Sequence, residues 1–134
     1  MAFRRYDLNM DTKEVTHVDI VAPETDVIDF PIVNPTFQGK KNCFHFLAEL
    51  LFSKGSTAVL KVDHCNGEKV TRWEEKGVFV SEPFFVDDPK STKEDYGTIM
   101  LSVFDEKINK NRMIMIDATT MKTMSDTTLP TFIP

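Results

Sequence analysis

Short runs of apolar and β-branched residues alternate with polar, turn-forming residues along almost the whole chain. The clearest two runs are residues 98–105 and 112–117, and the polar segment 106–111 between them is typical of a β-hairpin turn. A further pair of runs flanks residues 9–13 in the same way. The pattern therefore predicts a chain built mainly from antiparallel strands.

Residues 58–63 and 70–74 predict another hairpin, because Asn66 and Gly67 between them both tolerate the positive φ angles of a tight turn. The apolar run at residues 43–52 is ambiguous, since three of its leucines could share one face of a short helix. We favour a strand there, because everything that flanks the run is predicted to be strand.

A weak internal repeat connects three of the predicted turns. Asn9, Asp63 and Asp117 each follow an apolar residue and precede a Thr or Asn by three positions, and consecutive members lie 54 residues apart. A short polar side chain in this place can hydrogen-bond the nearby backbone and close a turn. Such turns recur in many antiparallel proteins, but a β-rich period of about 50 residues is also that of a four-stranded propeller blade. We therefore predict an all-β chain that forms part of a β-propeller.

The composition narrows the classes of protein further. With 41% hydrophobic and 28% charged residues the chain can build a packed core, which argues against disorder. The formal net charge is −5 and no basic stripe is present, so a nucleic-acid partner is disfavoured. The longest apolar run is interrupted by charge and is far shorter than the roughly 20 residues of a membrane-spanning helix.

Two cysteines, Cys43 and Cys65, lie 22 residues apart without a Cys-x-x-Cys motif. Residues 1–11 contain two arginines but no apolar segment of a secretion signal. We therefore expect a cytoplasmic protein in which both cysteines are reduced thiols.

An ordered series of short motifs then carries a family resemblance. In chain order the motifs are Asp29-Phe30-Pro31 with Asn34, Gly39-Lys40-Lys41, Lys61-Val62-Asp63, Trp73, Val80-Ser81-Glu82-Pro83-Phe84-Phe85-Val86, Glu94-Asp95-Tyr96-Gly97, Leu101-Ser102, Asp117-Ala118 and Leu129-Pro130. The series resembles the C-terminal region of the carotenoid cleavage oxygenases, the family of the β-carotene oxygenases and the retinoid isomerohydrolase of the eye.

The resemblance implies that residues 1–134 are a C-terminal fragment of a seven-bladed propeller domain, amounting to about two blades and some edges. It implies one Fe(II) on the propeller axis, held by four histidines, and cleavage of a carotenoid or apocarotenoid double bond with O2. The family's last histidine ligand lies in a Gly-Phe-His-Gly-like motif directly after the stretch that here ends at Pro134. We therefore expect no iron ligand within this chain, and no activity from the chain alone.

The partners implied by the resemblance are a lipophilic polyene substrate and O2, with peripheral membrane contact as a further expectation for the parent protein. The alternative is a non-enzymatic β-propeller module that binds proteins or lipids. A Gly-Phe-His-Gly-like stretch after Pro134 would favour the enzyme, and its absence would favour the binding module.

The three histidines, His17, His45 and His64, match none of the family's ligand positions. None pairs with another at a spacing typical of metal ligands. A zinc site at His64 and Cys65 would need two further ligands that the sequence does not indicate. We interpret all three as exposed or satisfied core histidines.

Glu82 is the residue that we single out, because its carboxylate is the only charge in the apolar segment 78–86. In the family, the Glu of this motif accepts the ring N–H of an iron-bound histidine, which fixes the orientation of that ring. The alternative is a glutamate that faces water at a strand end marked by Pro83. Asp29 matches a position where the family often has a Glu with the same role, but its shorter side chain makes a structural role in a bend before Pro31 nearly as strong an alternative.

Two other polar motifs have simpler interpretations. Residues 94–97 could suggest an acidic metal-binding loop, but we interpret them as the solvated entry to a hairpin, with Gly97 at positive φ. Ser81 has no base near it in sequence, so nucleophilic catalysis is not indicated.

Overall fold

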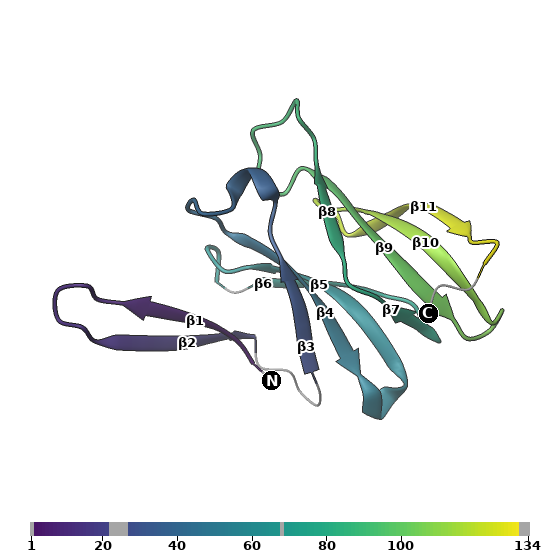
Figure 1. Cartoon of the computed structure of the whole chain (residues 1–134), viewed down its shortest axis with the longest axis horizontal. Helices are drawn as coiled ribbons and strands as arrows, with labels where there is room; N and C mark the ends of the chain where they lie inside the picture. The colour runs from purple at the N-terminus through teal and green to yellow at the C-terminus, as the bar shows by residue number, and fades with distance from the viewer. Residues whose placement is uncertain (1, 22–26, 68, 132–134) are drawn as a thin grey trace.

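The computed structural model describes residues 2–21, 27–67 and 69–131, which form three antiparallel β-sheets (Figure 1). The first sheet is a projecting hairpin of β1 (Phe3–Leu8) and β2 (Val15–Val21). The second sheet has the order β3 (Val27–Ile32), β4 (Phe44–Leu51), β5 (Ser56–Asp63), β6 (Lys69–Glu74). The third has the order β11 (Lys122–Thr128), β10 (Lys110–Asp117), β9 (Gly97–Asp105), β7 (Val78–Val80), with β8 (Phe84–Asp87) also paired to β9. The helices of the described residues are two short 3₁₀ turns, η1 (Pro35–Phe37) and η2 (Phe52–Lys54).

The all-β prediction and the predicted hairpins are confirmed. β9 and β10 cover the two clearest apolar runs, and the turn between them, at residues 106–109, is two residues shorter than predicted. The ambiguous run at residues 43–52 is a strand: every residue of β4 pairs with one of β5, and its other edge pairs with β3. Pairing on both edges provides the hydrogen bonds that a helix would otherwise have provided internally.

The internal repeat appears as three turns that are each closed by a side chain. Asn9, Asp63 and Asp117 stand at the β1–β2, β5–β6 and β10–β11 hairpins. In each turn the side-chain Oδ1 accepts hydrogen bonds from backbone N–H groups just ahead of it. Asn9 accepts from Asp11 (2.9 Å) and Thr12 (3.0 Å), Asp63 from Cys65 (3.1 Å) and Asn66 (3.2 Å), and Asp117 from Thr120 (2.6 Å). The predicted turn chemistry is therefore confirmed at all three positions.

The two central strands of the second sheet, β4 and β5, are buried on both of their faces. One face, which carries Phe46 and Val59, joins a core that continues into the third sheet. The opposite face, which carries Leu47 and Leu60, packs against Ile20 of the β1–β2 hairpin. The second and third sheets therefore pack face to face, which is the arrangement of neighbouring propeller blades, while the first sheet contacts the second through the base of its hairpin, at Phe3, Ile20 and Val21.

The third sheet is buried on one face only. Along β9 every second residue is buried, whereas all residues of β11 are exposed. On the buried face of β10, the Arg112 guanidinium meets three carboxylates, those of Glu75, Asp105 and Asp126. A buried cation needs this degree of compensation, because removal of its hydration is otherwise strongly unfavourable.

The prediction of a positive φ at Gly97 is wrong. The four glycines at positive φ are Gly39, Gly55, Gly67 and Gly77. Gly97 is instead required by a close approach, because a Cβ there would lie 2.4 Å from the carbonyl oxygen of Val86 and 2.7 Å from the ring of Phe85.

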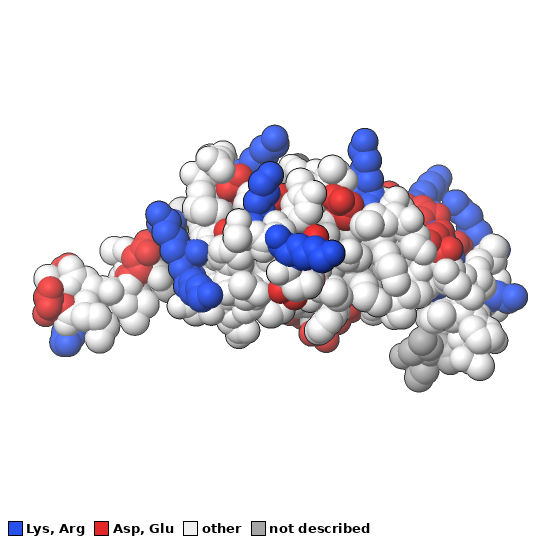
Figure 2. Space-filling model, turned by 90° about the horizontal axis from the view of Figure 1, so that it is seen from above, with Lys and Arg blue, Asp and Glu red and all other residues white. Residues whose placement is uncertain are grey.

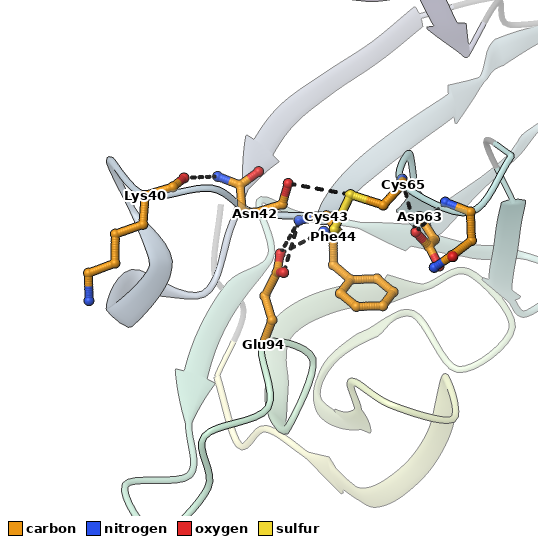
Figure 3. The surroundings of a disulfide bond; sticks show 8 residues. Lys40, Asn42, Cys43, Phe44, Asp63, Cys65 and Glu94 are labelled. Atoms are coloured by element: carbon orange, nitrogen blue, oxygen red, sulfur yellow. Dashed lines mark hydrogen bonds between the residues drawn. A yellow bond between two sulfur atoms is a disulfide. The ribbon is translucent and has the colours of Figure 1, made fainter.

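The prediction that Cys43 and Cys65 are free thiols is wrong, since the structure joins them in a disulfide (Figure 3). The reason is the register of β4 and β5, which pairs Phe44 with Asp63. The His64 N–H donates to the Cys43 carbonyl (3.0 Å) and extends the ladder, which brings the two cysteine Cα atoms to 5.2 Å. The expected cytoplasmic location is a separate matter and stays a prediction.

The charged side chains form no continuous basic stripe on the face shown in Figure 2, where lysines and arginines lie apart with acidic and uncharged residues between them. The described residues contain no helix long and apolar enough to cross a membrane.

Candidate functional site

Asp29 lies on β3, the edge strand of the second sheet, where the pairing with β4 shifts register between Asp29 and Ile32. Its Oδ1 accepts the N–H of Phe30 (2.8 Å), and Phe30 has a φ of 53°. This is the local hydrogen bond expected of a carboxylate that stabilises a backbone bend. The geometry therefore supports the structural role of Asp29, while any contact with a histidine stays a prediction.

The surroundings of Asp29 are partly hollow. Its side chain is exposed beside a cavity of about 450 Å³ between β1 and the second sheet, lined also by Arg4, Ile28, Pro31 and Leu47. The cavity is mostly apolar, apart from Asp29 and Arg4. The Arg4 guanidinium already forms an ion pair with Asp19 of β2.

Glu82 lies in the link between β7 and β8, two short strands that pair with successive parts of β9. The link is fixed by its neighbours, because Pro83 is fully buried and the Ser81 N–H donates to the Ser102 carbonyl (3.0 Å). The Ser81 hydroxyl also donates to that carbonyl (2.8 Å), so it is committed to a structural bond. The Glu82 side chain is exposed, and within the described part of the chain it has no ion pair or side-chain hydrogen bond.

Asp29 and Glu82 lie along comparable edges of two different sheets. Asp29 lies on β3, and Glu82 follows β7 by two residues; β3 and β7 each come first in chain order within their sheet and form one edge of it. In a propeller, one such edge of every blade lines the central channel. The described residues include no hydrogen bond or ion pair between these two carboxylates, so the structure places them on edges of the same kind without joining them.

Glu94 is a structural residue that the sequence analysis placed wrongly in a solvated loop. Its carboxylate accepts the backbone N–H of Cys43 (2.7 and 2.9 Å to its two oxygens) and that of Phe44 (2.6 Å), as Figure 3 shows. Its own carbonyl accepts a hydrogen bond from the Asn34 side chain (2.9 Å). The loop before β9 is thereby fastened to the start of β4.

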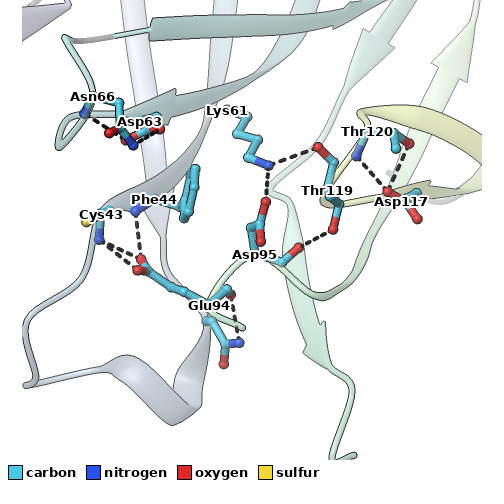
Figure 4. Close-up of polar contacts among 11 residues, drawn as sticks. Cys43, Phe44, Lys61, Asp63, Asn66, Glu94, Asp95, Asp117, Thr119 and Thr120 are labelled. Carbon is cyan, nitrogen blue, oxygen red and sulfur yellow. Dashed lines mark hydrogen bonds and ion pairs between the residues drawn. The ribbon is translucent and has the colours of Figure 1, made fainter. Parts of the chain in front are cut away.

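A second link between the same two sheets centres on Lys61, as Figure 4 shows. The Lys61 ammonium is buried, donates to Asp95 (2.7 Å) and to the Thr119 carbonyl (3.0 Å), and lies 4.6 Å from the centre of the Phe44 ring. The sequence did contain a sign of this link: Lys61 lies within the apolar run 58–62, and a charge in a buried strand requires a partner. The sequence did not show that Asp95 was that partner.

The histidines occupy two different environments. His17, on exposed β2, stacks loosely on Tyr6 with ring centroids 5.7 Å apart. His45 and His64 lie together at the ends of β4 and β5, with ring centroids 5.0 Å apart. Burial, and then the electrostatic influence of the neighbouring His64, lower the pKa of His45 to about 4. The described residues contain no group of three or more His, Cys, Asp or Glu placed to hold a metal ion.

Comparison with known proteins gives a consistent result. The family model described as retinal pigment epithelial membrane protein matches residues 1–134. β,β-Carotene 15,15'-dioxygenase of Gallus gallus is 31% identical over 103 residues, which are 76% of this chain and 19% of that protein. The chloroplastic 9-cis-epoxycarotenoid dioxygenase NCED1 of Oryza sativa subsp. japonica is 29% identical over an alignment of 136 positions, gaps included, which covers 95% of this chain and 21% of that protein.

Among solved structures, cobalt-substituted Synechocystis ACO superposes with a TM-score of 0.83 at 22% identity, over 99% of this chain and 28% of that one. At this identity the likeness shows the fold alone. It confirms that the described sheets have the arrangement of part of a larger β-propeller. The chain spans about a fifth of the length of the curated relatives above.

Proposed function

Because the chain belongs to the retinal pigment epithelial membrane protein family, we propose that it is part of an iron-dependent dioxygenase that cleaves a double bond of a carotenoid or apocarotenoid. The names of the relatives support this, since they include a β-carotene dioxygenase and an epoxycarotenoid dioxygenase. A lipophilic polyene and O2 are the proposed substrates of the complete protein.

The described residues do not themselves fit the proposed Fe(II). They contain no group of three or more metal-ligating side chains placed to hold it, and the histidines His45 and His64 lie beside the disulfide. We therefore assign the iron ligands to parts of the complete protein outside residues 1–134. The iron would bind and activate O2. This chain would supply the edges of two blades and a carboxylate that orients a ligand.

We assign that carboxylate to Glu82. The observation that supports this choice is an exposed carboxylate that has no partner among the described residues and is held at a sheet edge by the buried Pro83 and by the Ser81–Ser102 bonds. A histidine that binds a metal through one ring nitrogen donates its other N–H to such an acceptor, which fixes the tautomer and raises the basicity of the ligand. Asp29 is a weaker candidate, because its carboxylate already accepts the Phe30 N–H.

The test uses the complete protein with Glu82→Gln and Glu82→Ala. Loss of the acceptor is expected to lower iron affinity or turnover about 10–100-fold for Glu82→Ala, with a smaller loss for the neutral but isosteric Gln. The matched control is Glu106→Gln in the exposed β9–β10 turn, with iron content, carotenoid turnover and thermal melts measured in parallel. Full iron and full turnover in a folded Glu82→Ala protein would rule out the assignment.

The cytoplasm remains the proposed compartment, and peripheral contact with a membrane is proposed for the complete protein. Cell fractionation with a salt and carbonate wash tests both. Recovery in the secreted fraction would contradict the first proposal, and a purely soluble distribution would contradict the second.

A further inference from the structure

Two cysteines and two histidines meet at one end of the β4–β5 pair. Cys43 precedes β4 by one residue and His45 is the second residue of that strand, while His64 and Cys65 follow β5 directly. The bond from the His64 N–H to the Cys43 carbonyl places these two residues opposite each other. Because side chains alternate along a strand, Cys43 and His45 lie on the same face, the one covered by the β1–β2 hairpin.

The two imidazole rings have hydrogen-bonding capacity that the protein does not use. The Nδ1 atoms of His45 and His64 are both buried without a hydrogen-bond partner. The rings line one cavity of about 350 Å³ together with Asn42 and Phe3, and the ring centroids of Phe3 and His45 lie 5.0 Å apart. Buried polar atoms are nearly always paired, so two unpaired ring nitrogens side by side indicate a ligand that binds both.

We propose that reduction of the Cys43–Cys65 disulfide creates a Zn²⁺ site of the Cys₂His₂ type, with Cys43, His45, His64 and Cys65 as its ligands. His64 and Cys65 are adjacent in the sequence. The structure adds Cys43 and His45, the two ligands that the sequence did not indicate. Two thiolates and two imidazoles are a donor set that Zn²⁺ prefers over Mg²⁺ or Ca²⁺. The site is separate from the proposed iron and is independent of the proposed function.

The chemistry balances with a dithiol reductant. The reductant gives two electrons and two protons, the Cys43–Cys65 bond breaks into two thiols, and a disulfide forms in the reductant. Zn²⁺ then displaces the two thiol protons and binds the thiolates. Cys65 is exposed in its turn, so a reductant can reach its sulfur. A reducing cytoplasm would favour the open form.

The spacing of the four side chains suits a tetrahedral ion. Two thiolates on one Zn²⁺, each at about 2.3 Å, lie roughly 3.8 Å apart, and two imidazole nitrogens at about 2.0–2.1 Å lie roughly 3.4 Å apart. The cysteine Cα atoms are 5.2 Å apart and the ring centroids 5.0 Å apart. The movement that separates the two sulfur atoms would fall on the exposed turn that carries Cys65.

The test compares oxidised and phosphine-reduced forms of the 134-residue chain in anaerobic equilibrium dialysis against Zn²⁺, with metal content measured by mass spectrometry. We expect one Zn²⁺ per reduced chain and affinity more than about 100-fold weaker in the oxidised chain, which lacks both thiolates. Co²⁺ in place of Zn²⁺ should give thiolate-to-cobalt charge-transfer bands in the reduced chain only.

Variants separate the site from adventitious binding. Cys65→Ser and His64→Gln should each weaken Zn²⁺ binding to the reduced chain by more than about 10-fold, whereas His17→Gln, on exposed β2, should bind as the parent does. Circular dichroism confirms that each variant is folded, and the cobalt spectrum of the parent chain decides the matter if a variant is not. Equal binding by both redox forms, or no thiolate-to-cobalt band on reduction, would overturn the proposal. Neither readout depends on iron loading or carotenoid cleavage.

Discussion

Glu94→Ala is predicted to destabilise the fold strongly. The Glu94 carboxylate accepts the backbone N–H groups of Cys43 and Phe44, which lie some 50 positions away in the sequence. Both donors stand at the start of β4, where the second sheet meets the loop that leads into β9. Alanine removes the acceptor and leaves both N–H groups unpaired in a partly buried place.

The magnitude follows from the number of hydrogen bonds and their surroundings. A hydrogen bond to a charged group contributes about 1.5–3 kcal/mol, so two donors give an upper range of about 3–6 kcal/mol. Cys43 and Phe44 are only partly buried, and water can replace part of the loss. We therefore expect the free energy of unfolding to fall by about 2–4 kcal/mol, or roughly 8–15 °C in Tm for a chain of this size. Glu94→Gln retains one acceptor oxygen and should lose about half as much.

The assay is urea unfolding of both variants, followed by circular dichroism, with thermal melts in parallel. Glu106→Ala is the control, because its side chain is exposed in the β9–β10 turn and its loss should change stability by less than about 0.5 kcal/mol. If Glu94→Ala unfolds within about 0.5 kcal/mol of the parent chain, the carboxylate does not fasten the two sheets and the reasoning fails.

Three other substitutions test the packing and the charges. Arg112→Met should destabilise by about 3–5 kcal/mol in urea unfolding, because it leaves the buried Asp105 carboxylate without its cation; a loss below about 1 kcal/mol would contradict this. Gly97→Ala should cost about 1–3 kcal/mol, since the new Cβ would strike the Val86 carbonyl, and an unchanged melting temperature would refute the close approach. The His45 pKa is lowered from 6.5 to about 4, so the unfolded chain takes up more protons and stability should fall as pH drops from about 6.5 to 4. In oxidised protein with chelator present, His45→Phe should remove about 1–2 kcal/mol of that fall, and an unaltered pH profile of stability would show that His45 is not the group.

The features that the sequence predicted are those fixed by neighbouring residues. The turns at Asn9, Asp63 and Asp117 were predictable because each side chain bonds a backbone N–H two or three positions ahead. The strands β9 and β10 were predictable because their runs are rich in β-branched and apolar residues and are joined by a short polar turn.

The features that the sequence missed depend on which distant strands meet. Nothing in the run around Glu94 indicates that its carboxylate reaches the start of β4, because that contact requires the packing of two sheets. The disulfide was missed for a related reason: the spacing of Cys43 and Cys65 says nothing until the register of β4 and β5 is known. The family motif at residues 94–97 drew attention to Glu94 but did not indicate that its carboxylate binds the backbone of Cys43 and Phe44.

The burial of the strands is also consistent with a chain that forms part of a propeller. β5 is buried on both faces and is accordingly a nearly continuous apolar run, interrupted by Lys61, whose charge is met by Asp95 of the neighbouring sheet. Burial alternates along β9 because only one of its faces is covered. The uncovered face of this sheet carries apolar side chains such as Phe84 of the paired β8, which is 65% exposed. A sheet in a closed propeller has a neighbour on each face, so its strands become apolar on both. Strands β4 and β5 of the second sheet already meet this condition, because the third sheet covers one of their faces and the base of the β1–β2 hairpin covers part of the other. Their apolar runs at residues 46–48 and 58–60 accordingly show no alternation.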